Sequence, residues 1–229
     1  RPNQIQPREG FFTIPREGRI EDFVTRMIDT RLSGAESYRL HVRPEGITIS
    51  AGTPRGLFYA MQSVRQLIAT SVGRIPCMCI CDEPAYPYRA FMIDCARHFF
   101  TVADLKKMID AAALFKMNVF HWHLTDDQGW RAEVKKHPEL TEIGSMRRSS
   151  DFGGIHVAGP YGGAYTQEQM KEIVAYCAER YIEVVPEFDM PGHTSALLAA
   201  HPALSPARAG RFRCKQSKGF LKIFYVQAR

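Results

Sequence analysis

Acidic, basic and imidazole side chains gather at three points of the sequence, each just after an apolar stretch. The three points are residues 94–98, 121–128 and 186–193. Carboxylates and imidazoles can exchange protons, and a guanidinium can bind vicinal hydroxyls through its planar fork. A single such residue is more often a helix cap or a surface charge, but so many together would be costly to bury without a ligand or mutual pairing. The pattern therefore favours a polar site capable of acid–base chemistry.

Parallel βα units would bring these three points together. The periodicity predicts alternating strands and helices over residues 90–95, 101–115, 118–124, 166–177 and 182–189. Alternation along a strand puts His121 and His123 on one face, and likewise Glu187 and Asp189. Because reactive side chains of α/β barrels lie at the carboxyl ends of the strands, we expect the three polar ends to share one mouth.

The residues before this pattern predict a small α/β domain. Apolar residues at helical spacing predict a helix over residues 18–32, and alternation over residues 36–50 predicts a hairpin. A second helix is expected to begin at Pro54. The proline-rich stretch at residues 82–87 interrupts the periodicity, as a linker would. We therefore predict an α/β protein with a small α+β domain over 1–83 and part of a barrel over 84–205.

The composition is that of a globular protein, with its positive charge concentrated at one end. The chain has 229 residues, 45% of them hydrophobic, and a net charge of +6, and no apolar run approaches the roughly 18 residues of a membrane span. Residues 206–229 hold seven Lys or Arg and no acid, whereas residues 1–205 hold 23 bases against 24 acids. Nothing in the first 205 residues indicates a nucleic-acid partner. We interpret residues 206–229 as an aberrant basic tail, with a nucleic-acid arm as the alternative.

Two groups of residues invite a metal interpretation. In an extended segment the side chains of the cysteines at positions 77, 79 and 81 would lie about 6.5 to 7 Å apart. A zinc ion would need their sulfur atoms roughly 4 Å from one another. They are therefore predicted to be structural thiols. The pair His121 and His123 is retained as an alternative metal site. Asp126, Asp189 or His193 would complete it. Two histidines at this spacing are weak support for it, and we predict no metal and no cofactor.

The polar strand ends resemble glycoside hydrolase family 20, the β-N-acetylhexosaminidases. The resemblance rests on residues 82–84, 89, 93–100, 118–128 and 186–193. It covers roughly residues 10–205, and it departs from the family at Ala90, where glycine is usual. It implies the small domain that precedes the catalytic barrel, followed by about three βα units of an incomplete TIM (β/α)8 barrel.

The resemblance also implies a substrate. Carried over by position, it makes Arg97 the residue that binds the 3- and 4-hydroxyls of a terminal N-acetylhexosamine, and it makes His123 a residue at the base of the pocket. The implied enzyme removes terminal non-reducing N-acetylhexosamine from β-linked glycans by substrate-assisted, retaining catalysis. A secreted, periplasmic or lysosomal location is implied as well. The sequence gives no indication of oligomeric state.

The resemblance assigns four further residues to a network that supports the general acid. Asp126 and His193 would form a relay that orients and tunes the acid, with Glu187 and Asp189 in the same polar network. The general acid Glu and its Asp partner belong to a Gly-Gly-Asp-Glu string in the family, and this sequence contains no such string. We therefore expect an inactive, truncated form, with a non-catalytic hexosamine-binding or scaffold remnant as the alternative.

Overall fold

The computed structural model describes residues 2–152 and 155–205, which form two compact units. Unit 1 comprises the residues up to Arg89 together with Asp110–Asn118, and unit 2 comprises Ala90–Ile109 together with the described residues from Val119 onward. The predicted basic tail, residues 206–229, lies outside the described residues. Within the described ranges, no helix combines the length and hydropathy needed to cross a bilayer.

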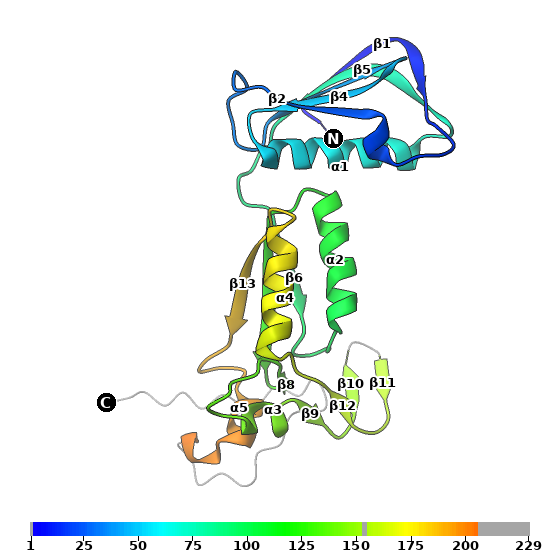
Figure 1. Ribbon diagram of the computed structural model, residues 1–229. Helices are drawn as coiled ribbons and strands as arrows, with labels where there is room; N and C mark the ends of the chain where they lie inside the picture. Colours follow the sequence, from blue (N-terminus) through cyan, green and yellow to red (C-terminus); the bar gives the residue numbers. More distant parts are fainter. Residues whose placement is uncertain (1, 153–154, 206–229) are drawn as a thin grey trace. The chain divides into compact units, whose positions relative to one another are not determined.

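Unit 1 contains a five-stranded sheet with helix α1 lying along one face (Figure 1). The strand order is β1-β5-β3-β4-β2, and every neighbouring pair is antiparallel except β2 with β4. The strands are β1 (Gln4–Thr13), β2 (Val24–Ile28), β3 (Tyr38–Arg43), β4 (Gly46–Ala51) and β5 (Arg74–Asp82). The predicted hairpin is confirmed as β3 and β4, in which Arg43 pairs with Gly46.

The predicted second helix is confirmed as α1 (Pro54–Thr70). Thr53 Oγ1 accepts a hydrogen bond from the backbone N–H of Gly56 at 3.0 Å, which satisfies one of the free donors of the first turn. A side chain at Gly56 would put a Cβ atom 2.7 Å from the Cβ of Ala51, so the glycine allows α1 to approach the sheet closely. Beneath the helix, Leu40 and Val64 belong to one buried apolar core.

The helix predicted over residues 18–32 is wrong. This segment forms a short 3-10 turn, η1 (Ile20–Asp22), followed by strand β2. β2 pairs in parallel with β4, where Val24 lies opposite Ile47. The apolar spacing was misleading because Met27 and Ile28 are both 52% exposed and mark no buried helical face.

Strand β5 contains the cysteine triplet. It has the extended conformation on which the structural-thiol prediction rests, with Cys77 buried and Cys79 and Cys81 partly buried. The Sγ of Cys79 lies 3.8 Å from Nε2 of His41 on β3. In the part of the chain that the structure describes, the three sulfurs do not form a compact ligand group.

Unit 2 contains three parallel strands in the order β13-β7-β6, as predicted, with β8 added antiparallel to the end of β7. Helices α2 and α4 run alongside these strands, and the shorter elements gather at the strands' carboxyl ends (Figure 1). The bounds are β6 (Ala90–Asp94), α2 (Val102–Leu114), β7 (Val119–Asp126), β8 (Gly129–Trp130), α4 (Gln167–Ala178) and β13 (Glu183–Phe188). Among the described residues the outer edges of β6 and β13 are unpaired, so the sheet is an open portion of a barrel.

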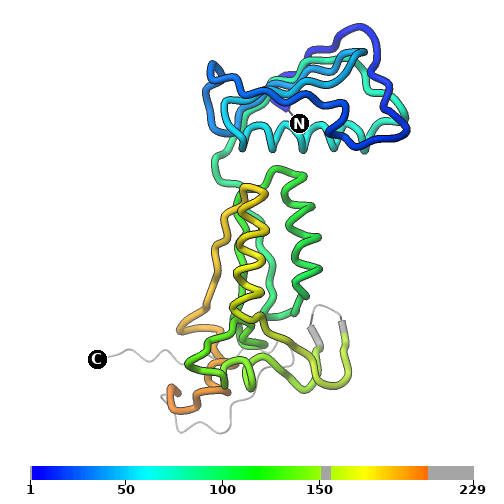
Figure 2. The backbone as a smooth tube through the Cα atoms, viewed as in Figure 1, coloured from blue at the N-terminus to red at the C-terminus, as the bar shows by residue number. Residues whose placement is uncertain are grey.

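The long segment between β7 and α4 contains short elements of its own (Figure 1), and Figure 2 traces the course of its described backbone. They are β8, α3 (Glu139–Glu142), β9 (Met146–Arg147), β10 (Ser150–Phe152), β11 (Ile155–Val157) and β12 (Tyr161–Gly162). The fully buried Arg131 joins this segment to the end of β6. Its guanidinium donates to the carbonyls of Cys95 (2.9 Å), Ala96 (2.6 Å), Ser145 (2.5 Å) and Gly163 (3.0 Å).

Candidate active site

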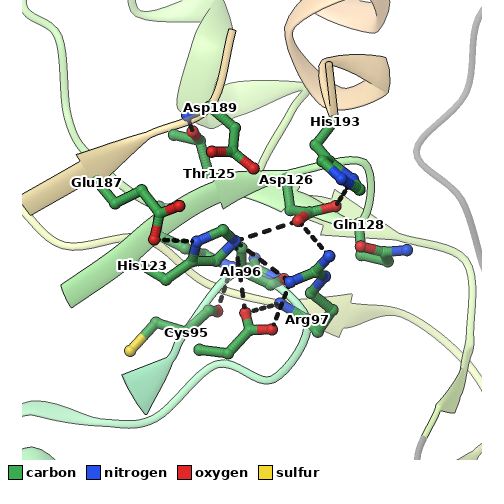
Figure 3. A network of polar contacts seen from close by, with 12 residues as sticks. Cys95, Ala96, Arg97, His123, Thr125, Asp126, Gln128, Glu187, Asp189 and His193 are labelled. Carbon is green, nitrogen blue, oxygen red and sulfur yellow. Dashed lines mark hydrogen bonds and ion pairs between the residues drawn. The ribbon is translucent and has the colours of Figure 1, made fainter. Parts of the chain in front are cut away.

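The register of the three parallel strands brings the predicted polar residues together (Figure 3). On β7, His123 lies opposite Asp94 of β6 on one side and opposite Glu187 of β13 on the other. The three strands end at the same edge of the sheet, as parallel strands of a barrel must. All six predicted site residues belong to this one network of contacts: Arg97, His123, Asp126, Glu187, Asp189 and His193.

Two carboxylates hold the guanidinium of Arg97. Its Nη1 lies 2.9 Å from Oδ2 of Asp94, and its Nη2 lies 2.6 Å from Oδ2 of Asp126. The backbone N–H of Arg97 also donates to Oδ1 of Asp94 at 2.9 Å, so one aspartate fixes both ends of the residue. Burial opposes the charged form, but the charge and hydrogen bond of Asp94, with the charge of Asp126, raise the pKa of Arg97. The side chain is thus a fixed cation at the edge of the site.

His123 is buried between carboxylates and is only 3% exposed. Its Nδ1 lies 2.6 Å from Oε2 of Glu187, and its Nε2 lies 3.1 Å from Oδ2 of Asp126. Burial alone would lower the pKa of His123, but its hydrogen bonds to Asp126 and Glu187 outweigh this effect and raise the pKa to about 9. Both ring nitrogens therefore carry protons at neutral pH. Nε2 of His123 lies 3.4 Å from Nη1 of Arg97, so two cations are neighbours here.

Glu187 contacts both histidines of β7. Its Oε2 lies 2.6 Å from Nε2 of His121 and 2.6 Å from Nδ1 of His123, which confirms that the two rings share a face. Burial opposes the charged form of Glu187, but its hydrogen bond to His123 lowers its pKa. Burial and the adjacent Glu187 carboxyl have the opposite effect on Asp189 and raise its pKa. The two neighbouring carboxyls therefore differ in proton affinity.

His193 reaches Asp126 from the segment after β13. Its Nδ1 lies 3.3 Å from Oδ1 of Asp126, and its backbone φ of 52° is in the left-handed region that is uncommon for a residue other than glycine. The side chain is 50% exposed, whereas that of Asp126 is 1% exposed. Asp126 therefore lies between a solvent-facing imidazole on one side and the guanidinium of Arg97 and the buried ring of His123 on the other.

Sequence reasoning did not include Asp94 and Asp127 among the site residues. Asp94 fixes Arg97, and the Asp-x-x-Arg spacing was the available signal. Asp127 accepts hydrogen bonds from the backbone N–H (3.1 Å) and the hydroxyl (2.6 Å) of Ser195. This contact fixes the start of α5 (Ser195–Ala200), which follows His193.

The alternative metal site does not fit this geometry. Among the described residues, the ligand groups of this region are His123 with Asp126 and Asp189, and Asp126 with Asp127 and His193, so His121 takes part in neither. The guanidinium of Arg97 already lies 2.6 Å from Asp126, and a metal cation bound there would meet its charge. The carboxylates of this site are balanced by Arg97 and His123 instead.

Family models match most of the chain. The model described as "Glycosyl hydrolase family 20, catalytic domain" matches residues 86–223, and "Glycosyl hydrolase family 20, domain 2" matches residues 14–83. A curated beta-hexosaminidase of Porphyromonas gingivalis is 46% identical over 188 residues, covering 78% of this chain and 23% of the relative. A second, from Akkermansia muciniphila, is 47% identical over 170 residues, covering 73% of this chain and 34% of the relative. The chain thus spans between about a quarter and a third of these relatives' length.

Solved structures share the same architecture. The chain is similar to a beta-N-acetylhexosaminidase with a TM-score of 0.84 and 38% identity, over 97% of this chain and 46% of the other. A mutant Streptomyces plicatus beta-hexosaminidase in complex with the product GlcNAc matches with a TM-score of 0.82 and 32% identity, over 95% of this chain and 50% of the other. These matches cover both units, and the chain belongs to glycosyl hydrolase family 20.

Proposed function

We propose that this chain supplies the sugar-binding part and the acid-supporting network of a β-N-acetylhexosaminidase site, which acts on the terminal non-reducing N-acetylhexosamine of β-linked glycans. The observation that carries the proposal is the arrangement of Arg97, a cation fixed by Asp94 and Asp126 at the carboxyl ends of the strands. Similar proteins support the substrate class, since one was solved with GlcNAc as product.

Arg97 is suited to bind a pair of sugar hydroxyls. A guanidinium has five N–H donors in one plane, and the two carboxylate contacts occupy only part of this set. The side chain is one-quarter exposed, so the remaining donors of its Nη groups can reach a ligand. Adjacent hydroxyls of a pyranose match a planar fork better than they match a single ammonium group.

The role we propose for His193 and Asp126 is to orient and tune a general acid. Oδ1 of Asp126 lies 3.3 Å from Nδ1 of His193, while Oδ2 lies 2.6 Å from Nη2 of Arg97 and 3.1 Å from Nε2 of His123, so one buried carboxylate contacts both the exposed imidazole and the two groups behind it. Glu187 and Asp189 extend the same network on β13. In the family's substrate-assisted mechanism the sugar's own acetamido oxygen attacks the anomeric carbon, while an Asp steadies the oxazoline nitrogen and the adjacent Glu protonates the leaving oxygen. The string that carries this Asp-Glu pair is absent from the sequence in hand.

Sugar binding tests the first part of the proposal. In two-dimensional NMR spectra of the isotope-labelled chain, N-acetylglucosamine is expected to shift the amide signals at the ends of β6, β7 and β13 in a saturable way, with a dissociation constant in the millimolar range. Arg97→Met should abolish the shifts. Arg26→Met, which removes an exposed arginine in unit 1, is the matched control. Shifts that survive in Arg97→Met, or none at all up to 50 mM sugar (about ten times a 5 mM constant), contradict the proposal.

A turnover assay separates the catalytic proposal from a second candidate, a non-catalytic hexosamine-binding protein. The presence of Arg97 without the Gly-Gly-Asp-Glu string favours this second candidate for the chain on its own. With an aryl β-N-acetylglucosaminide we expect release of the aryl group at no more than the background rate. Turnover comparable to that of a full-length relative would show that the acid comes from residues not recognised in this sequence.

A further inference from the structure

Two histidines and a glutamate converge on the surface of unit 2, at residues outside the sugar site. Oε1 of Glu139 lies 3.4 Å from Nδ1 of His137 and 3.1 Å from Nε2 of His201. The two rings are 5.3 Å apart, centroid to centroid, at an interplanar angle of 79°. One ligand atom of each residue lies within 4.8 Å of the ligand atoms of the other two. Three typical metal-ligand groups therefore face one point.

The backbone around these residues is fixed by its own packing. Helices α3 and α5 pack over a core of Trp130, Leu140 and Ala196. The N–H of His137 donates to the carbonyl of Val134 at 2.8 Å. The N–H of His201 donates to the carbonyl of Leu197, also at 2.8 Å. The ligand atoms thus come from two elements far apart in the sequence that are held together by a shared core rather than by the polar contacts themselves.

The two measured distances are compatible with shared coordination of one ion. Metal–ligand bonds of about 2.0 to 2.2 Å in a tetrahedron separate neighbouring ligand atoms by roughly 3.3 to 3.6 Å, which matches the His137 contact of 3.4 Å and is slightly longer than the His201 contact of 3.1 Å. An N–H···O hydrogen bond is usually about 2.9 to 3.0 Å, so the 3.4 Å contact of His137 is long for one. The His137 side chain is 56% exposed, which gives an ion direct access from solvent.

We propose that His137, Glu139 and His201 bind a divalent transition-metal ion of the zinc class, with water as the fourth ligand, and that the ion links α3 to α5. Two imidazoles and one carboxylate are a ligand set that Zn²⁺ takes in tetrahedral sites. Because the imidazoles must be unprotonated to coordinate, protons compete with the ion for this site. The site shares no residue with the network around Arg97, so its occupancy is independent of the proposed sugar binding.

Calorimetric titration of the chelator-treated chain with Zn²⁺ tests this site. We expect one equivalent to bind, and His137→Ala, His201→Ala and Glu139→Gln each to weaken binding at least tenfold. His41→Ala in unit 1 is the matched control and should bind as the unaltered chain does. His193→Ala removes the competing ligand group near Asp126 and should also leave the affinity unchanged. If His193→Ala abolishes binding, or if the unaltered chain binds no Zn²⁺, the proposal is wrong.

A spectroscopic measurement on the unaltered chain guards against variants that fail to fold. Co²⁺ in place of Zn²⁺ is expected to give the strong visible absorption of a tetrahedral site and to broaden the NMR signals of the His137 and His201 rings. Far-UV circular dichroism checks that each variant is folded before its affinity is used. Broadening of the His121 or His193 ring in place of these two would assign the ion to the sugar site and overturn the proposal.

Discussion

The two units bury very different side chains beneath similar secondary structure. In unit 1 the sheet and α1 enclose an apolar core built from residues such as Leu40, Ile49 and Val64. Among the described residues, Gln62 and Ser63 are its only buried polar side chains. In unit 2 the central strand β7 buries His123, Thr125 and Asp126 next to its aromatic residues. Further polar side chains are buried in the segment that follows β7 and at the start of α5: Gln128, Arg131, Ser145, Arg147, Ser150 and Ser195.

The difference means that unit 1 is stabilised mainly by apolar burial, whereas unit 2 buries the polar side chains of the candidate site. Apolar burial stabilises unit 1 by roughly 25 cal/mol for each Å² removed from water and asks for no specific partner. Buried charges in unit 2 are tolerated only because each has an ion pair or hydrogen bond, so their positions are defined to within the length of those contacts. A binding site needs such definition, and we expect the two units to respond differently to substitution.

The largest effect is expected from Arg131→Met. It removes four hydrogen bonds from a charged donor to main-chain carbonyls, and each such bond is worth about 1.5 to 3 kcal/mol, so we expect unit 2 to lose ~4 kcal/mol or more. Urea unfolding followed by tryptophan fluorescence measures this, because both tryptophans, Trp122 and Trp130, lie in unit 2. Arg26→Met should change the free energy of unfolding by no more than about 0.5 kcal/mol. Equal losses in the two variants would contradict the specific role of Arg131.

Leu40→Ala tests whether the apolar core of unit 1 unfolds separately. Leu40 is fully buried, and its truncation should cost about 2 to 5 kcal/mol. We expect the circular dichroism transition of unit 1 to move to lower urea while the tryptophan transition of unit 2 stays in place. If both transitions move together, the two units unfold as one and the contrast between them does not extend to stability.

Unit 2 should also lose stability as the pH rises from 6.5 to 9, because of His123. The pKa of His123 is about 9 in the folded chain, against about 6.5 when unfolded, so its stabilising contribution is complete below pH 6.5 and is lost as the pH rises through 9. Urea midpoints from tryptophan fluorescence are therefore expected to fall between pH 6.5 and 9. His123→Gln should flatten this profile, whereas His41→Ala in unit 1 should leave it unchanged. A slope that persists in His123→Gln would assign the titration to another group.

The smallest effect is expected from the helix caps, where the two units are alike. Thr53 caps α1, and Thr166 caps α4 in a reciprocal pair with Gln169, at 3.1 Å and 2.9 Å. Thr53→Ala and Thr166→Ala should each cost about 1 kcal/mol in their own unit. Differential scanning calorimetry of both variants checks this. A loss above about 2 kcal/mol in either one would mean that the threonine has a role beyond capping.

The sequence was sufficient for elements whose apolar pattern matches their burial. The hairpin and the strands and helices of unit 2 were predicted because their apolar residues alternate or recur at helical spacing, and the start of α1 was predicted from Pro54. The segment over residues 18–32 was not, because Met27 and Ile28 are apolar but exposed. Pattern reasoning assumes that apolar residues are buried, and it fails where a strand leaves them in solvent.

The candidate site was predictable as a set of residues but not as a set of contacts. Polar residues at strand ends indicated Arg97 and Asp126, because parallel strands bring their ends together. No pattern indicated Arg131, whose partners are main-chain carbonyls that every residue carries. The convergence of His137, Glu139 and His201 was equally hidden, since it depends on how two short helices pack.

The hydrogen bonds of Arg131 also affect how freely this region can change in evolution. Its four acceptors are carbonyl groups of the main chain, and these persist whatever side chains stand at positions 95, 96, 145 and 163. Sequence drift at positions 95, 96 and 145 can therefore leave these hydrogen bonds in place, provided that the new side chains fit. Gly129 and Gly163 are different, because a Cβ atom would lie 2.4 Å from the guanidinium carbon of Arg131 at the first position and 2.5 Å from the Phe99 ring at the second. A library of variants of this region should therefore keep Arg131, Gly129 and Gly163 constant.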